Sequence, residues 1–124
     1  MISIPKQLAA IIQSAAERAC EGLTDPVIVT AEKNKEWEYV SPSAMKFFNM
    51  HKKKGSFGYK TCQEMAQAIL QNIDPDNEAI DRIELSQAGQ GPPDKAGFFM
   101  NIYLKPEFIQ AQIRSLYKNE TVRL

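Results

Sequence analysis

Aromatic and basic side chains gather in residues 34–60. Trp37, Tyr39 and Ser41 occupy alternate positions, which is typical of one face of a short strand. No acidic residue stands between Glu38 and Glu64, and the basic residues of this interval are Lys46, His51, Lys52, Lys53, Lys54 and Lys60. Aromatic rings stack on exposed bases and lysines contact phosphates, so the stretch predicts an RNA-binding surface. Its candidate contact residues are Asn34, Lys35, Trp37, Tyr39, Ser41, Lys52, Lys53, Lys54 and Lys60.

Each of these residues also has a structural interpretation. Tyr39 could be a half-buried sheet residue, because aromatic side chains of strands usually pack against a core. Trp37 could cover the edge of a sheet. The lysine run at residues 52–54 could be a solvated loop without a ligand. The sequence leaves these alternatives open.

The first half of the chain supplies elements that would hold this stretch in place. Ser3 and Pro5 predict the start of a helix, and an apolar stripe follows them at Leu8, Ile11, Ile12, Ala15, Ala19 and Leu23. Two β-rich segments at residues 26–30 and 37–41 should pair as antiparallel strands. Residues 43–50 are compatible with a short helix.

The second half predicts a similar set of elements. Thr61 and Glu64 form a capping box before a helical stripe of Cys62, Met65, Ala66, Ile69 and Ile73. Strands are expected at residues 80–85 and 98–104, with Phe99 in the core and a Gly-Pro loop at residues 86–96 between them. Pro106 opens a last helix that carries Phe108, Ile109, Ile113, Leu116 and Tyr117.

This order predicts an α+β two-layer sandwich, α-β-β-α-β-β-α, with a four-stranded antiparallel sheet covered by helices on one face. At 124 residues we expect a single domain, residues 1–124. Fifteen basic and fifteen acidic residues give no net charge, so any nucleic-acid binding must rest on a local patch. The acidic residues of positions 74–84 are too dispersed for a calcium loop and are expected to form a solvated face.

The remaining residue types argue against catalysis, metal binding and export. Cys20 and Cys62 fall on apolar helix faces and should be reduced core residues. No nucleophile, base and orienting residue form a recognisable set, and no metal-ligand spacing occurs. Neither a signal peptide nor a membrane-length apolar run is evident, so the expected compartment is the cytoplasm.

Short motifs follow one another in a definite order: P-V-I-V-T at 26–30, E-Y-V-S-P-S-A-M at 38–45, I-E-L-S-Q-A-G at 83–89 and G-F-F-M-N-I-Y-L at 97–104. In this order they resemble the N-terminal additional domain of the eukaryotic-type cytoplasmic arginyl-tRNA synthetase, over roughly residues 5–118. The resemblance implies an RNA-binding domain that contacts the outer corner of the tRNA, chiefly the D-loop. It also implies that the catalytic and anticodon-binding domains are absent from this chain.

Several positions match the family motif directly. Tyr39 corresponds to the aromatic residue of its G-D-Y motif, and Phe99 and Asn101 correspond to its F-x-N, which adds Asn101 to the candidate RNA contacts. The family's Gln and Asn after the tyrosine are replaced here by Val40 and Pro42. The polar side chains expected to read a base edge are therefore missing from this segment.

The expected function is a tRNA-positioning module of an arginyl-tRNA synthetase. Its implied partners are arginine tRNA and the parent's catalytic domain, which would use ATP and arginine, whereas the domain itself needs no cofactor. We expect a monomer that does not bind membranes. The alternative is a protein-interaction or structural docking module without direct RNA contact. Salt dependence separates the two, because phosphate contacts weaken steeply with salt and apolar contacts do not.

Overall fold

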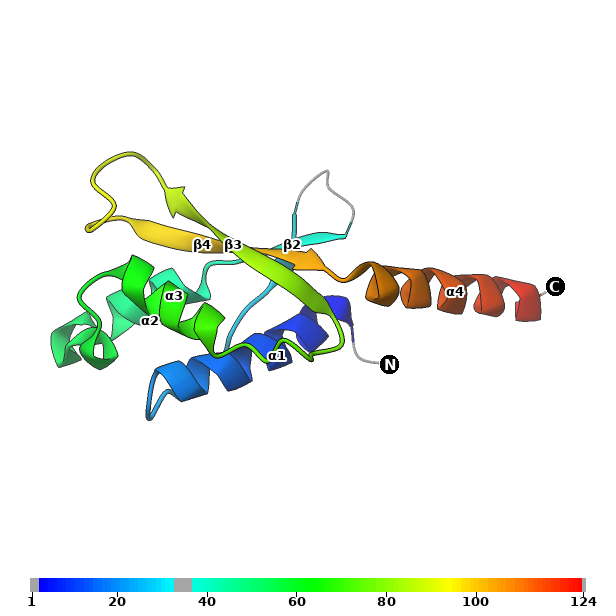
Figure 1. The fold of residues 1–124 in the computed structure, drawn as a ribbon, viewed down its shortest axis with the longest axis horizontal. Helices are drawn as coiled ribbons and strands as arrows, with labels where there is room; N and C mark the ends of the chain where they lie inside the picture. The colour runs from blue at the N-terminus through cyan, green and yellow to red at the C-terminus, as the bar shows by residue number, and fades with distance from the viewer. Residues whose placement is uncertain (1–2, 33–36, 124) are drawn as a thin grey trace.

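The computed structural model describes residues 3–32 and 37–123, with side chains described as far as residue 115. Within these residues the elements are α1 (Ile4–Ala19), β1 (Thr30–Ala31), β2 (Glu38–Ser41), α2 (Ser43–Met50), α3 (Cys62–Gln71), β3 (Ile80–Ala88), β4 (Gly97–Leu104) and α4 (Pro106–Arg123). The strands form one antiparallel sheet in the order β1-β2-β4-β3. Helices α1, α2 and α3 lie on one side of this sheet (Figure 1). The expected two-layer α+β sandwich is confirmed, with α2 as an additional helix in the order.

Helix α1 begins where local signals place it and ends a few residues earlier than expected. The Ser3 hydroxyl accepts a hydrogen bond from the Lys6 backbone N–H at 3.4 Å, and Pro5 lies in the first turn. The buried residues of its apolar stripe are Leu8, Ile12, Ala15 and Ala16. Beyond the helix, Gly22 adopts a φ of +86°, which glycine tolerates and other residues rarely do. The predicted helix is therefore confirmed, but it ends at Ala19, so Leu23 of the expected stripe lies beyond it.

The first strand is much shorter than expected. Residues 26–29 were predicted to lie in the sheet, yet β1 contains only Thr30–Ala31. The Ile28 backbone N–H instead donates to the Ser43 hydroxyl at 2.8 Å, and its carbonyl accepts from the Ser41 hydroxyl at 2.7 Å. Because side chains satisfy the Ile28 backbone, this segment needs no strand partner. The antiparallel pairing with β2 is correct, with Thr30 opposite Val40.

Helix α3 carries the predicted cap with one difference. The Glu64 backbone N–H donates to the Thr61 hydroxyl at 3.0 Å, as a capping box requires. The Glu64 carboxylate accepts from the backbone N–H of Lys60 at 3.0 Å rather than from that of Thr61. The cap therefore also fixes the chain that enters the helix.

Strands β3 and β4 form the longest pairing in the sheet. In β4 the side chains of Phe98, Met100, Ile102 and Leu104 are buried. Phe99 was expected in the core, but it lies opposite Ser86 on the face with Asn101 and is only partly buried. That prediction was wrong because consecutive aromatic residues in a strand must point to opposite faces, and here Phe98 takes the inner one.

Helix α4 is anchored to the core at its start. Phe108 is buried and Ile109 packs against the core, after which the helix runs away from the body of the domain (Figure 1). The side chains of Leu116 and Tyr117, which were expected on its apolar stripe, lie outside the described residues. No helix in the described part of the chain has the length and apolar character needed to span a membrane.

Both cysteines are buried and free, as expected. Burial raises the pKa of the Cys20 thiol from 9.0 to about 11. The folded chain holds this proton more tightly than the unfolded chain, so the resulting stabilisation is complete below pH 9 and is lost as pH rises toward about 11. We expect the free energy of unfolding to fall by on the order of 2 kcal/mol over that range. Denaturant titrations of wild type and Cys20→Ala should show a shallower pH dependence in the variant; equal slopes would contradict this assignment.

Candidate nucleic-acid interface

The basic residues lie on an ordered turn that connects α2 to α3, which we call the basic turn (residues 51–60). Lys52–Lys54 form one 3-10 turn and their side chains are exposed. The next four residues all have left-handed backbone angles, with φ of +87° at Gly55, +46° at Ser56, +58° at Phe57 and +91° at Gly58. Such angles are unfavourable for serine and phenylalanine, so surrounding contacts must hold them.

Those contacts tie the basic turn to the end of α1. The His51 Nε2 atom lies 2.6 Å from an Asp25 carboxylate oxygen, and its ring centroid lies 4.5 Å from that of Phe57. The Tyr59 hydroxyl donates to the Ala19 carbonyl at 2.6 Å, and the buried Ser56 hydroxyl donates to the Phe48 carbonyl at 2.9 Å. The lysines are therefore presented from a fixed backbone, which lowers the entropy lost when they bind a ligand.

A groove of about 420 Å³ separates α2 and the basic turn from the β3–β4 connection. Lys52 and Lys60 line one side, and Lys95 lines the other beside the single groove carboxylate, Asp94. The other lining residues are Met45, Phe48, Asn49, Cys62, Ala96 and Gly97. The groove combines lysines with an aromatic ring and an amide, which suits a nucleic-acid backbone with an accessible base. Within the residues that the structure describes, no group of three His, Cys, Asp or Glu side chains could hold a metal ion.

Gly97 is required by the packing at the base of this groove. A Cβ atom at this position would lie 2.2 Å from the Met45 sulfur. Such a contact is far shorter than van der Waals packing allows, so Met45 would have to move. The close approach keeps α2 against the start of β4.

The matches to known proteins agree with this fold. Residues 6–90, more than half of the chain, match the family model described as the arginyl tRNA synthetase N terminal domain. The chain belongs to this family. Arginyl-tRNA synthetase from Plasmodium falciparum shares its fold, with a TM-score of 0.66 and 21% sequence identity. That match covers 90% of this chain but 18% of the other, so the chain spans less than a fifth of the length of that protein. A search of curated proteins gives no match.

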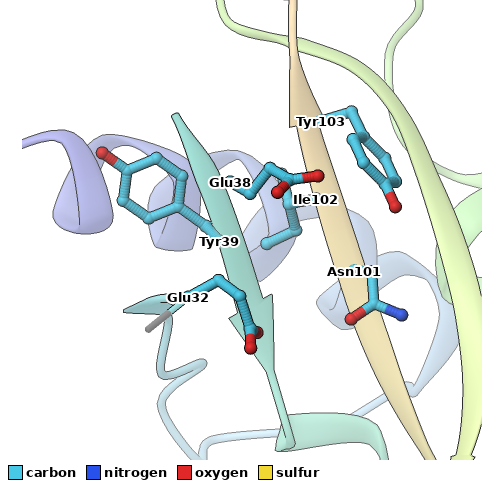
Figure 2. A pocket seen from close by; sticks show the side chains of 6 residues that line it. All are labelled: Glu32, Glu38, Tyr39, Asn101, Ile102 and Tyr103. Atoms are coloured by element: carbon cyan, nitrogen blue, oxygen red, sulfur yellow. The ribbon is translucent and has the colours of Figure 1, made fainter. Parts of the chain in front are cut away.

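Tyr39 of β2, the family's tyrosine, lies on the face of the sheet that the helices cover. Tyr39 lies opposite Ile102 of β4 and is partly buried against the core, and this burial raises the pKa of its hydroxyl. Figure 2 shows its ring on the side of α1, directed away from Asn101 and Tyr103. Ser41 is fully buried and bonded to the Ile28 carbonyl. Trp37 packs partly against the core with a φ of +63°.

The family's F-x-N residue Asn101 lies on the opposite, uncovered face of the sheet. Its side-chain N–H donates to the Ser86 hydroxyl at 2.9 Å. Beside it is a hollow of about 160 Å³ with two carboxylates in its lining, Glu32 and Glu38 (Figure 2). These two carboxylates disfavour a phosphate in the hollow, and the nearby Arg82 guanidinium, 4.2 Å from the centre of the Tyr103 ring, offsets only one of them.

The structure therefore separates residues that the sequence grouped together. Helix α2 spans eight residues between Ser41 and the basic turn, and Figure 1 shows β2 near the middle of the molecule, away from the end where that turn lies. Asn34 and Lys35 lie outside the described residues. Lys95 and Asn49 were not among the candidate RNA contacts expected from the sequence. For Lys95, the only signal in the sequence was its position in the Gly-Pro loop, next to the motif at residues 97–104.

Proposed function

We propose that this domain binds the D-loop corner of arginine tRNA through the groove and the basic turn. In doing so it would position the tRNA for the catalytic domain of a parent synthetase. The observation that carries this proposal is the convergence of three lysines on one groove, Lys52, Lys60 and Lys95, in a domain of the arginyl-tRNA synthetase family.

The chemistry of the groove supports binding rather than catalysis. Lysines on both walls would contact successive phosphates, and the exposed Lys53 and Lys54 would extend the positive surface along the basic turn. Phe48 and Asn49 would offer a ring and an amide to an unstacked base. The domain itself would need no metal or cofactor, while ATP and arginine would be used by the parent's catalytic domain in the cytoplasm.

The proposed interface differs from the set expected from sequence alone. It keeps Lys52, Lys53, Lys54 and Lys60, and it gains Lys95. It leaves out Tyr39 and Ser41, since one packs toward α1 and the other has no accessible surface. The polar residues of the uncovered sheet face are left out for their acidic surroundings.

Lys52→Gln combined with Lys60→Gln should weaken binding of arginine tRNA roughly 10- to 50-fold at about 0.1 M salt. Each lost phosphate contact should also reduce the slope of log affinity against log salt by about 0.7–0.9. The measurement is tRNA binding by fluorescence anisotropy from low to moderate salt.

The matched control removes two charges elsewhere, with Lys6→Gln and Arg114→Gln, which lie on α1 and α4. We expect this control to bind nearly as tightly as wild type. Equal losses in the two double variants would mean that only net charge matters and would contradict a site at the groove. Salt-insensitive binding to another protein, with no affinity for tRNA, would favour the docking alternative, for which the exposed Met50 offers apolar surface.

A further inference from the structure

Strand β3 lies at an edge of the sheet. The order β1-β2-β4-β3 places it next to β4 on one side, and no strand in the described residues pairs with its other side. A register shift between Ile80 and Arg82 makes an irregularity at the start of the strand. The regular edge therefore runs over residues 82–88, long enough to pair with an extended peptide through backbone hydrogen bonds.

A hollow adjoins the start of this edge. It has a volume of about 240 Å³ and lies between the end of α3, the turn that follows and β3. Three partly buried aliphatic side chains line it, Leu70, Ile73 and Ile83, together with Pro75, Asn77, Ile80, Asp81 and Arg82. The size of the hollow and its three aliphatic side chains suit one aliphatic side chain of a strand bound alongside.

The surroundings of the hollow are acidic. The exposed carboxylates of the α3–β3 turn and of β3 are Asp74, Asp76, Glu78, Asp81 and Glu84. Five carboxylates stand against two nearby cations, Arg82 and Lys105, which leaves a net charge of −3. The Arg82 Nη1 atom lies 3.6 Å from an Asp81 carboxylate oxygen, and its Nε atom lies 3.3 Å from a Glu84 carboxylate oxygen. The Lys105 ammonium donates to the carbonyls of Pro75 and Asn77. A basic ligand would therefore be favoured over an acidic one.

We propose that the β3 edge binds an extended basic segment of a partner protein, with one aliphatic side chain of that segment in the hollow. The edge supplies backbone hydrogen bonds to the segment, and the hollow holds its aliphatic side chain. The carboxylates favour lysine or arginine at the neighbouring positions of the segment. The hollow shares no lining residue with the RNA groove. Ile80 pairs with Leu104 at one end of β4 and Ala88 pairs with Gly97 at the other, which places the two ends about 25 Å apart. The hollow therefore lies apart from the groove, whereas the far end of the edge, at Ala88, pairs with the groove residue Gly97.

The test uses a synthetic peptide of alternating lysine and valine with one central leucine, added to the isotope-labelled chain and followed by NMR. We expect shifts and slower amide exchange along β3, and side-chain shifts at Leu70 and Ile73. Methylating alternate backbone nitrogens of the peptide should weaken binding at least about tenfold, because it removes the pairing. Replacing the central leucine by glycine, or the lysines by glutamates, should weaken it similarly.

Protein variants complete the test. Asp76→Lys with Glu78→Lys should weaken the lysine peptide about tenfold at low salt, whereas the matched control Glu17→Lys with Glu21→Lys, at the end of α1, should not. The proposal is overturned if β3 shows no response, if the N-methylated peptide binds equally well, or if both pairs of variants behave alike.

Discussion

Phe47→Ala should lower the free energy of unfolding by about 3–5 kcal/mol. The Phe47 ring is 2% exposed and belongs to the core cluster beneath the sheet, which also contains Ala44 and Met100. Removing it leaves a cavity that the short helix α2 cannot fill, because the helix is held by Gly97 at one end and the basic turn at the other. Urea unfolding monitored by circular dichroism would measure the loss.

The neighbouring phenylalanine provides the control. Phe48 is only partly buried and lines the groove, so Phe48→Ala should cost less stability and should weaken tRNA binding instead. If Phe47→Ala fails to fold, Phe47→Leu should remain folded, with a smaller loss and nearly unchanged tRNA affinity. Equal stability losses for Phe47→Ala and Phe48→Ala would mean that the faces of α2 have been assigned wrongly.

Helices were predictable because their signals are local. The Ser3 cap, the Thr61 cap and the apolar stripes of α1 and α3 all involve residues within a few turns of one another. Hydrophobic periodicity and capping residues specify such elements directly. The same reasoning located β4, whose alternation is regular from Phe98 to Leu104.

The length of β1 could not be predicted in the same way. Residues 26–30 have strong strand propensity, yet the hydroxyls that satisfy Ile28 come from Ser41 and Ser43. Nothing near Ile28 in the sequence indicates these partners. Tertiary contacts therefore decide whether this backbone joins the sheet, which is the usual limit of strand propensity.

The candidate site was predictable in part for a related reason. The acid-free interval identified Lys52 and Lys60 from local charge alone, and both line the groove. The opposite wall comes from Lys95 of the β3–β4 connection, which only the fold brings near. Conversely, Tyr39 and Lys52 are close in sequence, but α2 carries the chain away between them. The direction of α2 decides whether Tyr39 and Lys52 lie on the same surface, and that direction cannot be predicted from the sequence.

Gly97→Val should lower the free energy of unfolding by about 1–3 kcal/mol and weaken tRNA binding about tenfold. A Cβ at this position would overlap the Met45 sulfur, and Met45 is itself a groove residue. The least costly response is rotation of the Met45 side chain into the groove, where it would occupy space that the nucleic acid needs. Thermal unfolding and tRNA binding by the same protein preparation would measure both effects.

Combining Gly97→Val with Met45→Ala tests whether the losses of stability and tRNA affinity come from the overlap with Met45 or from general damage to β4. Since Met45→Ala removes the overlapping atoms, the double variant should recover about 1–2 kcal/mol relative to the sum of the single changes. It should also recover tRNA affinity, because the groove is open again. Additive losses in stability would show that the obstacle at Gly97 is the backbone of β4 rather than Met45. If the double variant recovers stability but not tRNA affinity, reopening the groove has not restored binding. That result would place the tRNA contact outside the groove.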